Sequence, residues 1–159
     1  MEKLKAIPEG YAYLFGSEKY PDIQGKAEFY EVYGGTVVVV EVSGLPKEEK
    51  EKNGGFFGFH IHEGNTCTGN PGDLLADTKG HFNPQNLTHP RHVGDLPPLL
   101  ADQGDAWMSV YTSGFFPEDV IGKTVVIHNM PDDFRSQPSG DSGEKIACGQ
   151  IIMGEEDER

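Results

Sequence analysis

The chain has 159 residues, with 21 glycines, 11 prolines and 36% hydrophobic residues. This length suits one domain with a packed core, whereas the glycine and proline content excludes a helical bundle. Thirteen basic residues against 26 acidic residues give a net charge of −13, which argues against nucleic-acid and anionic-membrane partners. We therefore expect a single domain over residues 1–159, with a core at about residues 25–152 and an acidic tail at 153–159.

The N-terminal residues 1–6 include two lysines but no apolar stretch follows them. A secretory leader needs such a stretch, so we expect a cytoplasmic protein, or an exported one whose leader has been removed. No apolar run approaches the roughly 20 residues that span a bilayer, so no membrane partner is expected.

Short runs of alternating apolar residues predict antiparallel strands. The first lies near residues 26–30, and Gly34 with Gly35 then predicts a two-residue hairpin turn before a strand at 37–42. The charged segment 47–53 is expected to form an exposed loop. Further strands are expected near residues 56–63, 106–112, 123–128 and 145–152.

Two long connections, residues 64–105 and 129–144, are rich in glycine, proline, aspartate and asparagine. Loops longer than about 15 residues are uncommon in compact domains unless they serve a function. These two contain or flank most of the histidines. The pattern predicts an all-β fold, a Greek-key antiparallel β-sandwich or barrel of the immunoglobulin-like kind, with about eight strands and two long functional loops.

Two histidines lie on the strand expected at residues 56–63. Because side chains alternate across a sheet, Phe57, Phe59 and Ile61 share the buried face, and His60 and His62 point together from the other face. Two imidazoles separated by one residue on a rigid strand can chelate a metal ion. Two surface histidines would give the same pattern.

A second group of metal-binding residue types occurs in the first long connection, where His81 is followed by His89, His92 and Asp95. The last three lie within seven residues, and nitrogen and oxygen ligands suit zinc. Chance clustering of polar residues in a loop is the alternative. His128 ends an apolar run, where a lone histidine is more often a satisfied core or surface residue.

The chain has two cysteines, Cys67 and Cys148, which are 81 positions apart. Neither belongs to a CxxC motif, which argues against a thioredoxin-like pair and against a cysteine zinc knuckle. The count alone leaves open whether they form a disulfide or stay as two buried thiols.

Taken together, these residues resemble the copper/zinc superoxide dismutase family over residues 25–152, nearly the whole chain. The matching motifs are GFHIHE at 58–63, HFNP at 81–84, HVGDL at 92–96, GKTVVIH at 122–128 and ACG at 147–149. Each of the six histidines falls on a ligand position of the family.

The resemblance implies a role for each of these residues. His60, His62, His81 and His128 would bind copper, and His81, His89, His92 and Asp95 would bind zinc, so that His81 bridges the two metals. Cys67 and Cys148 would form the family's disulfide. Asp132 would link a copper-binding imidazole to a zinc-binding one, with His60 and His89 as the candidates. His81 and Lys145 would act in catalysis, His81 through its proton and Lys145 beside the copper channel.

The activity implied is the dismutation of superoxide to dioxygen and hydrogen peroxide, by alternate reduction and reoxidation of copper next to a structural zinc. The alternative is a non-enzymatic relative on the same scaffold, either copper-handling or zinc-only. A structural or adhesive β-sandwich would leave the six histidines unexplained. Superoxide is the expected partner and a homodimer is an option, because dimer interfaces differ between branches of the family. The sequence does not indicate which partner would deliver copper.

Three features depart from the usual family pattern. Lys145 stands where the family usually has an arginine, so the charge is kept but the planar fork of donors is lost. Only Pro90 and Arg91 separate His89 from His92, a shorter spacing than in many members. The segment from Cys67 to His81 is longer than usual and resembles the disulfide loop of bacterial branches.

Overall fold

The computed structural model describes residues 7–48 and 50–155 of the chain. Its strands are β1 (Gly10–Gly16), β2 (Gln24–Val32), β3 (Gly35–Ser43), β4 (Phe56–Phe57), β5 (Phe59–His62), β6 (Leu99–Asp102), β7 (Asp105–Thr112), β8 (Thr124–His128), β9 (Lys145–Gln150) and β10 (Ile152–Met153). Three short helices complete the described elements: α1 (Lys50–Asn53), the 3-10 helix η1 (Ala76–Thr78) and α2 (Pro117–Val120). Residues 1–6, where a leader was considered, and residues 156–159 of the expected tail lie outside the described residues.

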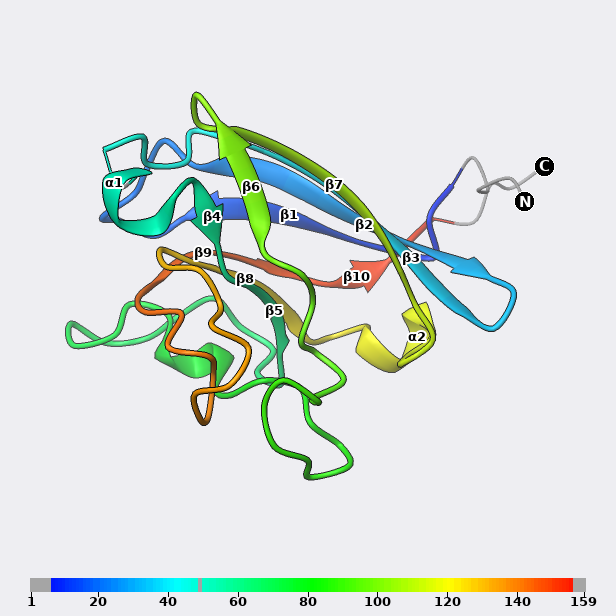
Figure 1. Ribbon diagram of the computed structural model, residues 1–159. Coiled ribbons are helices and arrows are strands. Elements are labelled where there is room, and N and C mark those ends of the chain that lie inside the picture. The colour runs from blue at the N-terminus through cyan, green and yellow to red at the C-terminus, as the bar shows by residue number, and fades with distance from the viewer. Residues whose placement is uncertain (1–6, 49, 156–159) are drawn as a thin grey trace.

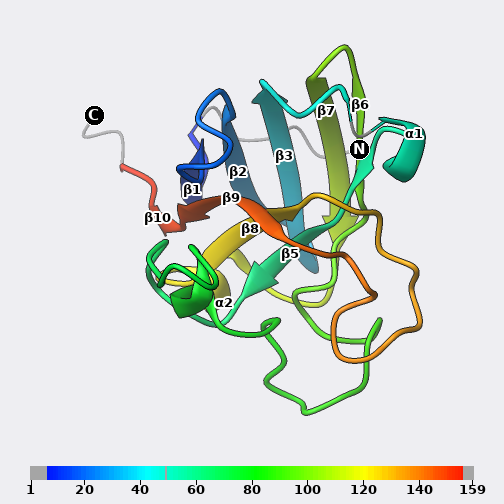
Figure 2. The same ribbon diagram turned by 90° about the vertical axis from the view of Figure 1, so that its left-hand side faces the viewer.

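The strands form a nearly closed antiparallel barrel. They pair in the order β4-β6-β7-β3-β2-β1-β9-β8-β5, and β10 extends the sheet beside β1. Figures 1 and 2 show β1, β2, β3 and β7 in one layer, crossed by β9, β8 and β5 in the other. Only Gly58 separates β4 from β5 and only Ile151 separates β9 from β10, so the described strands form eight continuous runs. The expected Greek-key β fold is confirmed.

The core lies between the two layers and follows from the period of two along each strand. Ala12 and Leu14 of β1 and Phe29 of β2 are fully buried, and they face Ile61 of β5 and Ile127 of β8. Burial of one such large apolar side chain stabilises the fold by roughly 1.5–3 kcal/mol. The core thereby fixes β5 and β8, which contain all three histidines that lie on the described strands.

Several local expectations were wrong. The hairpin turn is formed by Tyr33 and Gly34, because Gly35 already pairs with Val32; only Gly34 has the positive φ that favours glycine, +79°. The segment expected as an exposed loop contains helix α1, whose last residue, Asn53, is buried because its amide donates to the Asn129 carbonyl over 3.1 Å.

The structure also adds elements that the sequence pattern did not predict. β1 and α2 were missed, the strand expected at residues 145–152 is divided at Ile151 into β9 and β10, and β6 lies inside the connection expected at residues 64–105. Strand β6 forms a hairpin with β7 through Gln103 and Gly104, which both have positive φ. The second connection, residues 129–144, contains no strand among the described residues, as expected.

The two long connections lie together on the β5 side of the barrel. Figure 1 shows the green segment after β5 and the orange segment before β9 below the strands, next to each other. Among the described helices, none has the length and apolar character needed to cross a membrane.

Candidate metal centre

Strands β5 and β8 bring three histidines together. Their antiparallel register pairs Phe59 with Ile127 and His60 with Val126. His60 and His62 are 0% and 1% exposed and His128 is 3% exposed. The histidine face of β5 is therefore as buried as its apolar face, because the long connections cover it. Two surface histidines are excluded.

The first long connection is attached to β5 along its open edge. The amide of Phe82 donates to the Ile61 carbonyl over 2.8 Å, and the amide of Ile61 donates to the Gly94 carbonyl over 2.9 Å. Backbone bridges also join His62 to His81 and His60 to Asp95. These bonds satisfy the edge of the sheet and place the loop residues against the histidines of β5.

The side chains form two clusters that share His81. The first, which we call the four-histidine cluster, consists of His60, His62, His81 and His128, and the second, the His/Asp cluster, consists of His81, His89, His92 and Asp95. Within each cluster one ligand atom per residue can be chosen so that all lie within 4.8 Å of one another. The structure thus brings together every residue proposed as a ligand.

Backbone carbonyls fix the tautomers of two rings in the four-histidine cluster. The Nδ1–H of His62 donates to the Lys79 carbonyl over 2.7 Å, and the Nδ1–H of His128 donates to the Gly143 carbonyl over 3.1 Å. A carbonyl only accepts, so both protons are on Nδ1 and both Nε2 atoms present lone pairs. These two Nε2 atoms lie 3.2 Å apart.

Asp132 fixes two further rings, one in each cluster. The Nε2–H of His60 donates to Oδ2 of Asp132 and the Nε2–H of His89 donates to Oδ1, both over 2.8 Å. The amide of Phe134 also donates to Oδ1, over 2.7 Å. Asp132 therefore lies where the sequence comparison with the family placed it, between His60 and His89.

Space beside Asp132 depends on a glycine. Gly140 has a φ of +73°, and a Cβ on it would lie 2.1 Å from Oδ1 of Asp132 and 2.7 Å from Nε2 of His89. A side chain at this position would both strain the backbone and collide with the carboxylate. Gly140 thereby leaves room for the two hydrogen bonds.

Acceptor atoms face one another in both clusters. The Nδ1 atoms of His60 and His89 and the Nε2 atom of His81 are buried and have no hydrogen-bond partner in the protein. His89 Nδ1 also lies 3.0 Å from Oδ2 of Asp95, although the proton of His89 is on its other nitrogen. Facing lone pairs repel each other unless a cation lies between them. The ligand residues of each cluster therefore fit one metal ion, and the two clusters together fit two.

Burial keeps the imidazoles of His60, His62 and His128 neutral. It lowers the pKa of His128 to about 3, and it lowers the pKa of His60 and His62. Burial acts to raise the pKa of Asp132, but hydrogen bonds from His60 and His89 outweigh it and lower this pKa to about 2. Near neutral pH these three imidazoles are uncharged, and the carboxylates of Asp95 and Asp132, whose pKa values are both lowered, are ionised.

One supporting residue, Gln137, was missed by the sequence analysis. Its side-chain oxygen accepts the His89 amide over 2.9 Å, and its nitrogen donates to the His89 carbonyl over 2.7 Å. This pair of bonds ties the second long connection to the backbone of His89. No local signal in the sequence marks Gln137, because the contact joins positions 48 residues apart.

The family model and the curated relatives that match this chain all belong to one family. The family model of copper/zinc superoxide dismutase matches residues 23–151. Two curated superoxide dismutases [Cu-Zn] from Aquifex aeolicus are 33% and 34% identical and cover 82% and 80% of this chain, and 80% and 79% of their own lengths. The chain belongs to the copper/zinc superoxide dismutase family.

Other relatives agree with this assignment. An extracellular superoxide dismutase [Cu-Zn] from Caenorhabditis elegans is 32% identical over 98% of this chain and 74% of its own length. Among solved structures, a double mutant of a SOD-like protein from Bacillus subtilis superposes with a TM-score of 0.73 at 27% identity, and covers 93% of this chain and 99% of that chain. Both His-rich clusters of the superoxide dismutase family are complete in this chain.

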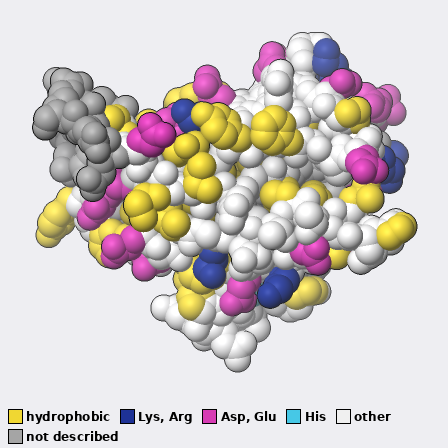
Figure 3. Space-filling model, turned by 180° about the vertical axis from the view of Figure 1, so that it is seen from behind, with side chains coloured by type: hydrophobic (Ala, Val, Ile, Leu, Met, Phe, Trp, Pro, Cys, Tyr) yellow, Lys and Arg dark blue, Asp and Glu magenta, His cyan; other side chains and the backbone are white. Residues whose placement is uncertain are grey.

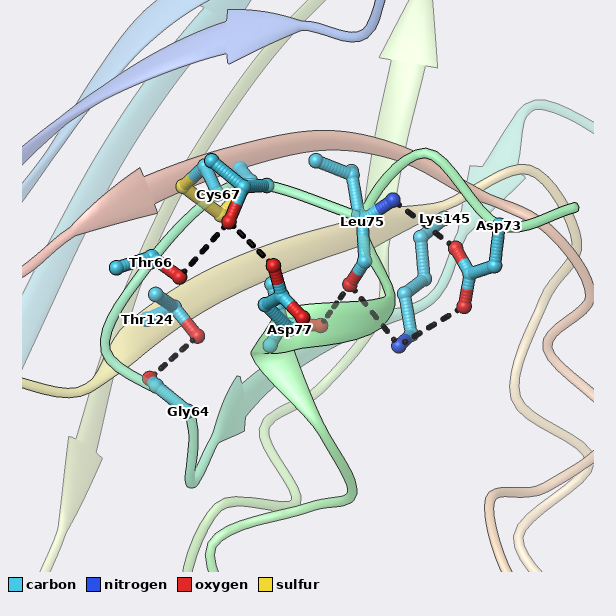
Figure 4. Close-up of a disulfide and its surroundings, with 11 residues drawn as sticks. Gly64, Thr66, Cys67, Asp73, Leu75, Asp77, Thr124 and Lys145 are labelled. Carbon is cyan, nitrogen blue, oxygen red and sulfur yellow. Dashed lines mark hydrogen bonds and ion pairs between the residues drawn. A yellow bond between two sulfur atoms is a disulfide. The ribbon is translucent and has the colours of Figure 1, made fainter. Parts of the chain in front are cut away.

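Cys67 and Cys148 form a disulfide, as the family resemblance implied, with their Cα atoms 5.7 Å apart. The bond fastens the first long connection to strand β9 (Figure 4). Beyond it, the Thr68 hydroxyl donates to Oδ2 of Asp77 over 2.5 Å, and the Asp77 amide donates to the Thr68 carbonyl over 2.9 Å. These contacts link the disulfide to η1.

Lys145 lies between η1 and the four-histidine cluster. Its Nζ donates to the Leu75 carbonyl over 3.3 Å and lies 3.5 Å from Oδ2 of Asp73 (Figure 4). It also donates to the Lys79 carbonyl over 3.3 Å. The side chain is 16% exposed. Lys145 also pairs with His128 in the β8–β9 register, so its charge lies beside that cluster.

Proposed function

We propose that this protein is an enzyme that dismutates superoxide with bound copper and zinc. Two superoxide anions and two protons would be converted to dioxygen and hydrogen peroxide. The observation that carries this proposal is the sharing of His81 by two complete clusters, together with the buried nitrogens of His60, His81 and His89 that have no hydrogen-bond partner. Membership of the superoxide dismutase family supports the same chemistry.

In this proposal, His60, His62, His81 and His128 would hold copper, and His81, His89, His92 and Asp95 would hold zinc. Copper supplies a one-electron redox couple, which zinc lacks. The tautomers described above leave Nδ1 of His60 and His89 and Nε2 of His62 and His128 without a proton. His89 keeps its place in the zinc set despite the short spacing to His92, because its Nδ1 faces Asp95.

In the same proposal, Asp132 orients two of the ligands, Lys145 attracts the superoxide anion, and His81 takes up and releases a proton. Asp132 fixes the orientation of the His60 and His89 rings through its two hydrogen bonds. The ammonium group of Lys145 provides a local positive charge for the anion in a chain whose net charge is −13. His81 Nε2 faces the four-histidine cluster and can take up and release a proton there.

We also propose that the whole chain, residues 1–159, forms one domain, which the family match over residues 23–151 supports. The substrate is proposed to be the superoxide anion. No described feature identifies a partner that delivers copper.

The test is a cytochrome c reduction assay with xanthine oxidase as the superoxide source, run on protein reconstituted with copper and zinc. Elemental analysis of the same sample gives the metal content. Inhibition of cytochrome c reduction that requires copper is the expected result. A protein that binds both metals and leaves superoxide untouched would instead be a non-enzymatic metal-binding relative, and the proposal would fail.

A further inference from the structure

The ammonium group of Lys145 is surrounded by acceptors of this chain. A lysine has three N–H donors and no acceptor. Two of these donors are used by backbone carbonyls, those of Leu75 and Lys79, each over 3.3 Å. The third is left for Asp73, whose Oδ2 lies 3.5 Å from the Lys145 Nζ. An anion from solution that binds Lys145 therefore has to replace one of these three acceptors.

The two carbonyls that bind Lys145 are held in place by further hydrogen bonds. The Leu75 carbonyl also accepts the Thr78 hydroxyl over 2.7 Å, and the Lys79 carbonyl accepts the Nδ1–H of His62 over 2.7 Å. The side chain of Asp73, by contrast, is 45% exposed. Asp73 is thus the acceptor that an incoming anion can displace.

A tight turn holds the Asp73 carboxylate toward Lys145. The Asp73 amide donates to the Asn70 carbonyl over 3.1 Å, and the Asn70 amide donates to the Asp73 carbonyl over 2.9 Å. In the side chain, Oδ1 of Asp73 accepts the Leu75 amide over 3.0 Å. Because Oδ1 is engaged in this way, Oδ2 is the oxygen that faces Lys145. The loop itself therefore fixes the position of the carboxylate.

Lys145 and Asp73 line a hollow in which positive and negative side chains are balanced. The hollow, of about 580 Å³, is also lined by Lys19 and Glu144. Lys19 pairs with Glu144 over 2.9 Å, just as Lys145 pairs with Asp73. On the face that Figure 3 presents, the described basic side chains likewise lie near acidic ones and form no broad basic patch. The positive charge that an anion meets at the hollow is therefore local and already paired.

We propose that Asp73 is an internal counter-ion that keeps divalent oxyanions, such as sulfate and phosphate, off Lys145. An unpaired lysine attracts a dianion about twice as strongly as a monoanion, and the charge of Asp73 cancels this attraction. Without Asp73 the dianion would gain most, and it would occupy Lys145 in place of the monoanion superoxide. Asp73 thereby determines which anions stay at Lys145. The inference rests on the proposed function, in which Lys145 attracts the superoxide anion.

The experiment is a sulfate titration of the metal-loaded protein, followed by isothermal titration calorimetry at constant ionic strength. Asp73→Asn is the central variant, because the Oδ1 of an asparagine can still accept the Leu75 amide, whereas its Nδ2 offers Lys145 no acceptor. The turn is thereby kept and only the counter-ion is removed. We expect sulfate to bind Asp73→Asn at least about fivefold more tightly than it binds the wild type.

Three further variants assign the effect to the pair of Asp73 and Lys145. Asp73→Glu keeps a carboxylate and is expected to bind sulfate as weakly as the wild type. Lys145→Met combined with Asp73→Asn removes the ammonium group and is expected to lose the gain in sulfate affinity. Asp102→Asn, at an exposed position of β6, makes the same charge change away from the hollow and should leave the sulfate affinity unchanged.

Three results would overturn the proposal. The first is an equal sulfate affinity of Asp73→Asn and the wild type, in proteins with normal circular dichroism and metal content. The second is a gain in Asp73→Asn that persists when Lys145 is replaced, because sulfate would then bind elsewhere. The third needs no Asp73 variant: micromolar sulfate affinity of the wild type that is lost in Lys145→Met.

The rate of superoxide removal, measured on the same samples without sulfate, separates this inference from the proposed function. We expect the rate to rise less in Asp73→Asn than the sulfate affinity does, and a rise as large as the gain in sulfate affinity would contradict the selection against dianions. A protein that shows the gain in sulfate affinity but removes no superoxide would refute the proposed function and support the role of Asp73.

Discussion

The Nε2–H of His60 donates to Oδ2 of Asp132 over 2.8 Å, while the second oxygen of the same carboxylate serves His89. One carboxylate thus orients a ring in each cluster. Replacement by asparagine leaves one of these rings facing an amide group that cannot accept its proton. We expect Asp132→Asn to lower zinc affinity about 10–100-fold.

Competition with a chromogenic chelator measures this affinity. Asp141→Asn, in an exposed position of the same loop, makes the same chemical change and is the matched control. If both variants bind zinc equally, Asp132 has no role in holding His89.

Lys145 is expected to determine how fast the anion reaches the site. Lys145→Glu reverses a positive charge beside the four-histidine cluster, and we expect the rate of superoxide removal to fall at least about tenfold at low salt. Lys145→Arg is expected to retain activity, since it keeps the charge and adds donors. Pulse radiolysis gives the rate, and Lys50→Glu on α1 controls for the change in net charge. An unaltered rate in K145E at full copper content would remove Lys145 from the proposed mechanism.

Salt should slow the proposed reaction. The net charge of −13 repels superoxide at long range, so attraction has to come from the positive charge near the site. Raising the ionic strength from about 0.01 to 0.15 M shortens the screening length from about 30 to 8 Å and weakens that attraction. We expect the rate to decrease over this range, and to decrease less in Lys145→Met. A rate that rises with salt would show that the overall negative field dominates.

The disulfide is expected to stabilise the metal-free protein. It closes a loop across 81 positions, for which the loop-closure model gives about 4.5 kcal/mol. In urea unfolding of the metal-free form, we expect Cys67→Ser/Cys148→Ser to lose about 2–5 kcal/mol. Reduction of the wild type should give the same loss, because the chain has no other cysteine. Equal stability of the oxidised and reduced forms would contradict this prediction.

Tyr30 is expected to make the stability of the folded protein depend on pH, apart from any effect of the metal centre. Burial and its hydrogen bond to Glu28, donated over 2.9 Å, raise its pKa from 10.0 to about 12. The folded state then holds this proton where the unfolded state has lost it, so stability is present below pH 10 and is lost as the pH rises toward 12. Tyr30→Phe should remove that part of the alkaline loss of stability. Tyr33→Phe, at the exposed hairpin tip, is the control and should leave the profile unchanged.

The sequence predicted the metal clusters better than the strands around them. Histidine spacing and a fixed side-chain alternation placed His60 and His62 on one face of β5, and the other ligands followed from the family motifs. Strand β1 was missed because its outward residues, Tyr11, Tyr13 and Phe15, are as apolar as the inward Ala12 and Leu14, so the period of two is hidden. Two of these aromatic residues, Tyr13 and Phe15, line an open hollow on the outer face of the sheet.

Contacts between distant segments could not be predicted from local pattern. Gln137 supports His89 across 48 positions, and Lys145 contacts Asp73 and Leu75, which lie in the connection that the disulfide joins to β9. Strand β6 forms because β4 and β7 lie on either side of it, although Leu99 and Leu100 show no alternation by themselves. Each of these features depends on the closed barrel.

The carbonyl of Lys79 accepts hydrogen bonds from both His62 Nδ1 and Lys145 Nζ. A single peptide unit therefore touches a proposed copper-binding ring and the proposed anion-attracting cation. Lys79 itself has a φ of +60°, an unusual conformation that directs this oxygen. When the loop that contains Lys79 moves, the His62 ring and the Lys145 ammonium group should move together. The distance between them should therefore be preserved.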